Sequence, residues 1–318
     1  MSNANLRNAQ ISQRDEFYIT YQDVQEELQH YSKHFKGKTV LCNCDDPRIS
    51  NFAKYFIENF NQLGLKRLIC TGYNKLAIMP QMSIWELLGG NPERGYLLDI
   101  TKVPVSIDDY QQLTYNGDFR TKECEQYLDE CDIVVTGPPF SLFREYLKLL
   151  MKHHKQFLIV GNVNAITYRE FFPLLKDNKV WLGASIHSGD RKFYVPKSYP
   201  LEAAGCGIDE DGHRFIRVKG VRWYTNLDYA QRHTDLVLHK TYTPEDYPKY
   251  DNYDAINVDN TSDIPKNYWG VMGVPITFLD KYNPSQFEIV KFRKGDNNKD
   301  LSIKGECPYF RILIRRLR

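Results

Sequence analysis

Short apolar runs that alternate with stretches of helical periodicity constrain the fold of this chain more than any other feature. The runs, which are typical of buried strands, occupy residues 38–44, 66–71, 95–100, 132–136, 156–160 and 179–183. Apolar residues recur at helical spacing over residues 21–35, and Ser50 is suited to cap a helix that reaches Phe60. The run at 95–100 could belong to a hairpin insertion. Strands and helices in alternation predict an α/β fold: a doubly wound, mostly parallel, Rossmann-like sheet with helices on both faces.

Two loops with unusual composition follow strands of this expected sheet. Residues 43–47 (NCDDP) follow the first long strand, and residues 136–140 (TGPPF) follow the strand at 132–136. Ligands of open α/β sheets bind beyond the carboxyl ends of the strands. We therefore expect both loops to open into one crevice.

The 318 residues suffice for one large catalytic domain and a smaller appendage. The strand and helix pattern gives way near residue 185 to short strands and loops rich in Asp, Asn, Tyr and Pro. We expect one domain over residues 1–185 and a second region over 186–318. The net charge of +2 does not by itself indicate nucleic-acid binding. Basic side chains still gather in two groups, namely Arg214, Arg217, Lys219 and Arg222, and Arg315, Arg316 and Arg318.

The seven cysteines and the composition of the N-terminus indicate the cellular compartment in which we expect the chain. The first residues carry no apolar core of a secretory signal, and no apolar run reaches membrane-spanning length. Free thiols in a reducing cytoplasm are the expectation, with no membrane partner and a monomeric chain. Cys42 and Cys44 lack a second Cys or His pair nearby, so no metal site is expected.

The loop that contains Gly137, Pro138, Pro139 and Phe140 offers groups suited to methylation of an exocyclic amine. Such an amine is a poor nucleophile, because its lone pair is delocalised into the ring. An Asp or Asn side chain and a proline-pair carbonyl can accept its two hydrogens, and an aromatic ring can stack on a flipped base. An ordinary proline-rich turn explains the loop equally well when the loop is considered alone, because its first position is Gly137.

Acidic residues in two other segments are candidates for binding a cofactor. Asp45 and Asp46 could accept hydrogen bonds from an ammonium or from ribose hydroxyls. They could equally be a helix N-terminal pair favoured by the helix dipole. Asp118 could hold an adenine amine, or it could be a turn residue beside Gly117.

Several motifs together resemble the EcoRI-type DNA adenine methyltransferases over nearly the whole chain, from about residue 12. The matching segments are DEFY at 15–18 with Thr20, CNCDDPR at 42–48, GDFR at 117–120, TGPPFSLFREY at 136–146, GNVNAITY at 161–168, KVWLG at 179–183, RWYTNLD at 222–228, GVMGVP at 270–275 and YFRILIR at 309–315.

This resemblance implies S-adenosylmethionine as the cofactor, double-stranded DNA as the partner and adenine N6 as the methyl acceptor. It also implies a DNA target-recognition role for residues 186–318. The implied catalytic residues are Thr136, Gly137, Pro138, Pro139 and Phe140. The implied cofactor-binding residues are Phe17, Tyr18, Thr20, Asn43, Asp45, Asp46, Pro47, Thr71, Asp118 and Phe119.

The chain departs from the family pattern at Gly137, where the family has Asn. Loss of one preorganised polar group can lower a rate on the order of 10²–10³-fold. Two rival functions therefore stay open. One is a DNA-binding module that keeps the cofactor fold but has lost catalysis, and the other is a cytosine-N4 methyltransferase.

Overall fold

A computed structural model of the chain describes residues 17–74, 94–197, 199–202 and 205–318, so Asp15 and Glu16 of the N-terminal motif lie outside it. The chain divides into two compact units, each built from two stretches of sequence: Met1–Ala165 with Ser188–Leu227, and Ile166–His187 with Asp228–Arg318. This division differs from the boundary expected at residue 185. The reason is that the segment 188–227 supplies strands that pair within the first unit.

The main sheet of the first unit has the strand order β5-β4-β3-β2-β6-β7-β12. Its four parallel strands are β2 (Thr39–Cys44), β3 (Arg67–Gly72), β6 (Ile133–Thr136) and β7 (Gln156–Asn162). Three antiparallel strands flank them: β4 (Tyr96–Ile100), β5 (Tyr110–Gln112) and β12 (Val221–Thr225). The expected α/β sheet is present but it is mixed, because β4 runs antiparallel to β3 and β12 runs antiparallel to β7.

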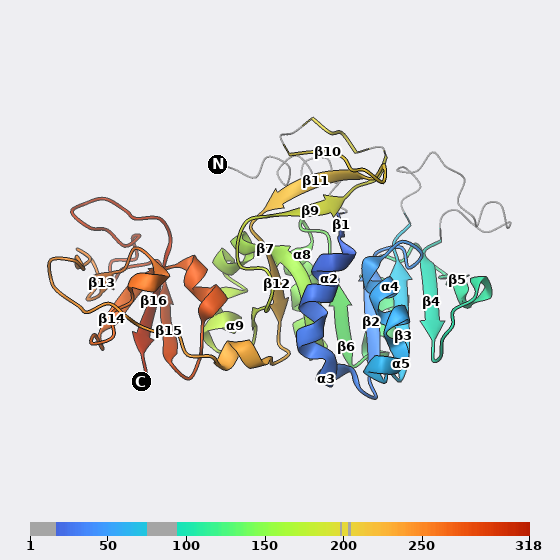
Figure 1. Ribbon diagram of the computed structural model, residues 1–318, viewed down its shortest axis with the longest axis horizontal. Coiled ribbons are helices and arrows are strands. Elements are labelled where there is room, and N and C mark those ends of the chain that lie inside the picture. The colour runs from blue at the N-terminus through green and yellow to red at the C-terminus, as the bar shows by residue number, and fades with distance from the viewer. Residues whose placement is uncertain (1–16, 75–93, 198, 203–204) are drawn as a thin grey trace. The chain divides into compact units, whose positions relative to one another are not determined.

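Helices cover both faces of this sheet. They are α2 (Tyr21–Leu28), α3 (Ser32–Phe35), α4 (Asn51–Glu58), α5 (Phe60–Leu63), α7 (Lys122–Glu130) and α8 (Phe143–Lys152). Neighbouring residues of a strand point to opposite faces. Trp223 packs on Phe52 of α4, whereas Tyr224 packs on Phe143 of α8. The helices α4 and α8 therefore lie on opposite faces, with α4 in front of the sheet in Figure 1.

The helices form where the sequence predicts them. Over residues 21–35, the four residues at helical spacing (Val24, Leu28, Tyr31 and Phe35) are all fully buried. A 3-10 turn at Gln29–Tyr31 separates α2 from α3. Ser50 caps α4 by accepting a hydrogen bond from the backbone N–H of Ala53.

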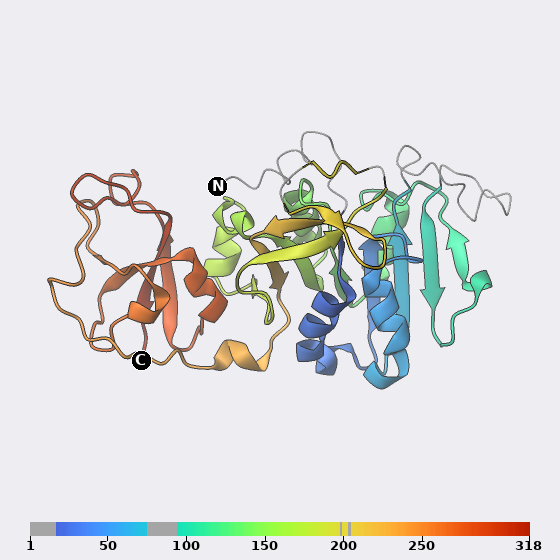
Figure 2. The same ribbon diagram turned by 45° about the horizontal axis from the view of Figure 1, so that its top comes forward.

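A second, antiparallel sheet in the first unit joins distant parts of the sequence. It has the order β1-β9-β11-β10 and comprises β1 (Tyr18–Ile19), β9 (Asp190–Tyr194), β11 (Arg214–Lys219) and β10 (Gly207–Ile208). In Figure 1, β9 and β11 lie above the end at which β6 finishes, while Figure 2 shows the same sheet from a view turned by 45°. This small sheet thus lies beyond the edge of the main sheet at which the proline-containing candidate loop begins.

The second unit has its own four-stranded sheet of order β13-β14-β16-β15. Its strands are β13 (Ile256–Asn257), β14 (Val271–Pro275), β16 (Arg311–Arg316) and β15 (Phe287–Phe292). The helix α9 (Phe172–Lys176) packs on β15, and the run expected at 179–183 forms only the short β8 (Trp181–Leu182). Short 3-10 turns at Ala230–His233, Thr261–Asp263 and Ile276–Lys281 connect the rest.

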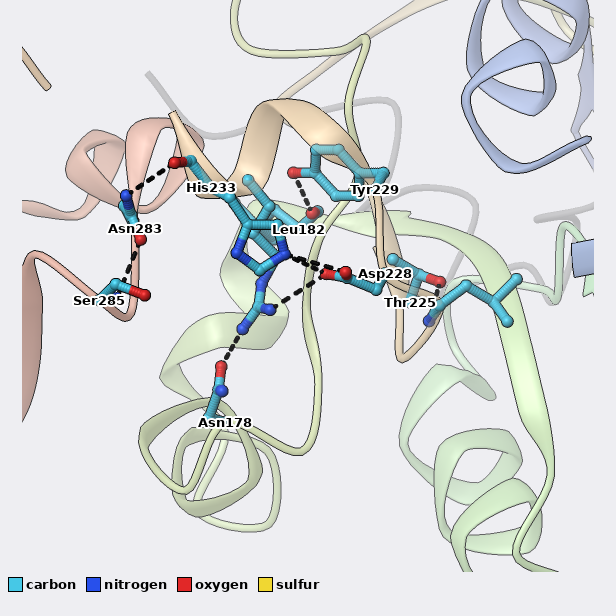
Figure 3. A network of polar contacts seen from close by, with 10 residues as sticks. Asn178, Leu182, Thr225, Asp228, Tyr229, His233, Asn283 and Ser285 are labelled. Atoms are coloured by element: carbon cyan, nitrogen blue, oxygen red, sulfur yellow. Dashed lines mark hydrogen bonds and ion pairs between the residues drawn. The ribbon is translucent and has the colours of Figure 1, made fainter. Parts of the chain in front are cut away.

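A polar network holds together the two sequence stretches of the second unit (Figure 3). The guanidinium of Arg232 is nearly buried, lies 3.8 Å from the centre of the Trp181 ring and donates to Asn178. Asp228 accepts from Arg232 at 3.4 Å and contacts the ring of His233 at 2.7 Å. Because Asn178 and Trp181 come from the first stretch and Arg232 from the second, this cluster fastens the two stretches to each other.

Candidate functional site

The two loops singled out in the sequence start side by side. The strands β2 and β6 are parallel neighbours, with Leu41 paired to Val134, and both end at the same edge of the sheet. The hydroxyl of Thr136, the last residue of β6, donates to the backbone carbonyl of Asn43. The strand order also reverses here, since β3 lies on one side of β2 and β6 on the other. Both loops therefore begin at the same edge of the sheet, which the expectation of a shared crevice requires.

We call residues 44–47 the acidic loop. Three glycines let backbone segments beside this loop pack closely, and we call Gly72, Gly95 and Gly117 the glycine junction. Of the three, Gly72 lies against the acidic loop itself. A Cβ on Gly72 would lie 2.8 Å from the carbonyl oxygen of Asp45, and a Cβ on Gly117 would lie 2.1 Å from the carbonyl oxygen of Gly72. Gly117 also has a φ of +80°, which favours glycine. Sequence reasoning missed this role for Gly72 and Gly95, because it depends on contacts between segments far apart in the chain.

The carboxylates of the acidic loop differ in their partners. Asp46 is held by Arg48, with a shortest nitrogen–oxygen distance of 2.5 Å, and the Arg48 guanidinium lies over the Tyr96 ring. Asp45 instead accepts a hydrogen bond from the Ser50 hydroxyl at 3.2 Å. A cationic ligand group that approached Asp46 would have to share its carboxylate with Arg48.

Asp118 follows the glycine junction directly and forms an ion pair with Arg120 at 2.6 Å. Partial burial opposes ionisation of this carboxyl, but the hydrogen bonds from Arg120 outweigh it and lower the pKa of Asp118. The carboxylate stays charged, and a ligand amine would have to share it with Arg120.

Three further candidate cofactor residues are buried behind the loops. Asn43, Thr71 and Phe119 are 5%, 1% and 6% exposed. Thr71 lies on β3 beside Asn43 in register, and Phe119 packs edge-on against the Tyr146 ring at 4.9 Å. Their side chains therefore lie below the surface at this edge of the sheet, and solvent hardly reaches them.

The candidate cofactor-binding residues near the N-terminus lie in different surroundings. Phe17 lies in an aromatic cluster with Phe140, at 5.8 Å between ring centres, and with Phe193 and Tyr199, both at 6.0 Å. Tyr18 pairs with β9. The Thr20 hydroxyl caps α2 by accepting from the backbone N–H of Asp23 and donates to the carboxylate of the same residue. Thr20 therefore has a structural role that the sequence analysis did not assign to it.

We call residues 137–140 the proline loop. The Pro139 carbonyl accepts a hydrogen bond from the backbone N–H of Leu142, so this oxygen is already engaged. Phe140 is 8% exposed and packs edge-on against Phe17 and Phe193. Gly137 has a φ outside the left-handed region, and the nearest described atom to a Cβ there would be Cε2 of Phe52, at 3.5 Å. The loop therefore accommodates a Cβ at this position in ordinary van der Waals contact.

The basic cluster of the sequence analysis separates in the structure. Arg222 is only 4% exposed and donates to the carbonyl of Val221, so it does not belong with the surface charges. Arg214 donates to the carbonyl of Tyr199, and Arg217 lies 3.4 Å from Asp190. The strand β12 buries Arg222 because it lies inside the sheet beside β7.

Among the described residues, one group has the spacing of metal ligands, namely Asp209, Asp211 and His213. Asp209 in this group already forms an ion pair with Lys192 at 2.6 Å. No helix among the described residues is long and apolar enough to cross a membrane. All seven cysteines carry free thiols.

Comparison with known proteins assigns a family to this arrangement. The family model described as adenine-specific methyltransferase EcoRI matches residues 5–317. The chain is 50% identical to the type II methyltransferase M.EcoRI of Escherichia coli, over 100% of this chain and 98% of that protein. It is 34% identical to the type II methyltransferase M.MpnI of Mycoplasma pneumoniae, over 98% of both. The search of solved structures gave no match. The chain belongs to the EcoRI family of adenine-specific methyltransferases.

Proposed function

We propose that this chain is a site-specific DNA methyltransferase that transfers a methyl group from S-adenosylmethionine to adenine N6. The observation that carries the proposal is the meeting of the acidic loop and the proline loop at the switch point between β2 and β6. A methyl donor beside the first loop and a flipped base beside the second would bring the two reacting groups together. Its relatives are named type II methyltransferases, which supports a role of this chain in a restriction-modification system.

The residues of the edge fit an S-adenosylmethionine molecule in part. The cofactor supplies an electrophilic methyl group and carries an ammonium, a carboxylate and ribose hydroxyls. Asp45 and the amide of Asn43 are the side chains best placed to bind these groups, with Pro47 shaping the loop. Asp46 and Asp118 already form ion pairs with Arg48 and Arg120. A cofactor group that contacted either carboxylate would have to share it with the arginine. Thr71 and Phe119 support the site from below.

The proline loop would hold the target base. Thr136 anchors its start through the bond to Asn43, and Phe140 offers a ring for stacking. Because the Pro139 carbonyl is engaged, the Pro138 carbonyl is the better candidate to accept a hydrogen from the adenine amine. The second acceptor for the amine would be the Asn side chain of the family pattern, which is absent at Gly137.

DNA recognition would fall to residues after about 186. These residues form part of the small sheet over the edge and most of the second unit. A monomer acting in the cytoplasm completes the proposal.

Sequencing of methylated bases tests the proposal directly. The chain would be expressed in cells that lack adenine methylation, and their DNA read for modified bases. N6-methyladenine within one short motif is the expected result, and N4-methylcytosine would overturn the choice of base.

A second candidate function follows from Gly137. A chain that binds S-adenosylmethionine and one DNA sequence, but leaves no methylated base, would be a binding module. Calorimetry with the cofactor and a salt-controlled DNA-binding assay identify this outcome.

A further inference from the structure

Tyr146, at the end of the first turn of α8, has no role in the function proposed above, yet it contacts Asn43 between the two loops. Its side chain is fully buried, and its hydroxyl donates to Oδ1 of Asn43 at 2.5 Å. A buried hydroxyl needs a partner, and this one finds it on the strand that leads into the acidic loop.

Asn43 receives hydrogen bonds from both ends of the segment that contains the proline loop. The Thr136 hydroxyl, just before that loop, donates to the Asn43 backbone carbonyl. The Tyr146 hydroxyl, just after it, donates to the side-chain carbonyl, and the Cys44 thiol approaches the same oxygen at 3.6 Å. One residue of β2 thus fixes the proline loop to the acidic loop.

The ring of Tyr146 also reaches a third segment of the site. It stands perpendicular to the Phe119 ring, at 4.9 Å between centres, directly after Asp118. Burial raises the pKa of the Tyr146 hydroxyl well above its usual value. The hydroxyl therefore keeps its proton near neutral pH and acts as a donor to Asn43.

The bond from Tyr146 selects one orientation of the Asn43 amide. With Oδ1 turned toward the hydroxyl, Nδ2 points to the other side, and it makes no hydrogen bond to the part of the chain that the structure describes. We propose that Tyr146 is a positioning residue that orients Asn43 so that its Nδ2 donates to the bound cofactor. The inference rests on the proposed function, because it requires S-adenosylmethionine at the acidic loop.

The test is removal of the hydroxyl alone. Tyr146→Phe should raise the Kd of the full chain for S-adenosylmethionine roughly tenfold, because the amide loses the donor that fixes it. Tyr224→Phe is the matched control, since Tyr224 is equally buried, packs on the same helix and donates to the Asn162 carbonyl. It should lose a comparable amount of thermal stability and keep its cofactor affinity.

Asn43→Ala completes a double-mutant cycle read by calorimetry. In that background Tyr146→Phe should have no further effect on the Kd, because the amide it orients is gone. If Tyr146→Phe lowers the melting temperature as Tyr224→Phe does but leaves the Kd unchanged, the inference is overturned. If Tyr146→Phe does not fold, Asn43→Ala still decides, because an unchanged Kd would show that the cofactor makes no use of this amide. A native chain with no affinity for S-adenosylmethionine would instead refute the proposed function.

Discussion

The glycine junction and the glycine of the proline loop contrast sharply in their packing, although both lie at the same edge of the sheet. At Gly72 and Gly117, an added Cβ would come within 2.8 Å and 2.1 Å of backbone oxygens, which cannot move aside. At Gly137 the nearest described atom would be 3.5 Å away, on a phenyl ring. The first glycines are therefore required by packing, and Gly137 is not.

This contrast separates two reasons for a glycine to stand in a functional site. Where backbones touch, glycine preserves the architecture and a substitution costs stability. Where space remains, glycine lacks a side chain that the reaction could use, and the consequence is a lower reaction rate. Substitutions at Gly137 and Gly117 can break or sharpen this distinction, and substitutions at Asp45 and Asp46 extend the comparison to the acidic loop.

The largest expected effect is on catalysis and comes from Gly137→Asn. Asn supplies the missing acceptor for the adenine amine, so the single-turnover methylation rate should rise roughly 10²–10³-fold. Binding of cofactor and DNA should hardly change, because the new interaction strengthens in the transition state. Gly137→Ala is the control: it occupies the same space without an acceptor and should leave the rate low. A slower Gly137→Asn enzyme would mean that backbone carbonyls already supply both acceptors.

The next effect is on stability and compares one substitution at two glycines. Gly117→Ala places a Cβ against the Gly72 carbonyl at a positive φ, and should lower the free energy of unfolding by about 2–4 kcal/mol. Gly137→Ala should change it by less than about 1 kcal/mol. Urea denaturation measures both, and equal losses would remove the distinction between the two regions.

The smallest effect compares the two carboxylates of the acidic loop. Asp45→Ala should weaken S-adenosylmethionine binding by about 10- to 100-fold, the range for a lost hydrogen bond to a charged group. Asp46→Ala should weaken it less, because the Asp46 carboxylate is already held by Arg48. Calorimetry gives both affinities, and a larger loss for Asp46→Ala would reverse the assignment.

Local patterns predicted the local parts of this molecule well. The strands β2, β3, β6 and β7 and the cap at Ser50 lie where apolar runs and helix signals indicated. The adjacency of the two loops also followed from the sequence, because parallel strands end at one edge. These features depend on residues close in the chain or on a general rule of sheet geometry.

Pairing between strands that are far apart in the sequence left no such local signal. Nothing near Tyr18 indicates that it pairs with Tyr194, and nothing near Arg222 indicates that β12 buries it beside β7. The closeness of Gly72 to Gly117 is likewise a property of the folded chain. The sequence pattern therefore located the loops, but it could not give the partners of Asp46, Asp118 and Asn43.

The two-stretch composition of each unit has a consequence for the order in which the protein folds. During synthesis the first unit is interrupted after Ala165 by a stretch that belongs to the second, and it resumes only at Ser188. The strand β12 and the partner of β1 emerge from the ribosome after that interruption. Pairing across such sequence distances is slow, and unpaired edges are prone to aggregate while they wait. The nascent chain must therefore hold an incomplete first unit until Leu227 has been made.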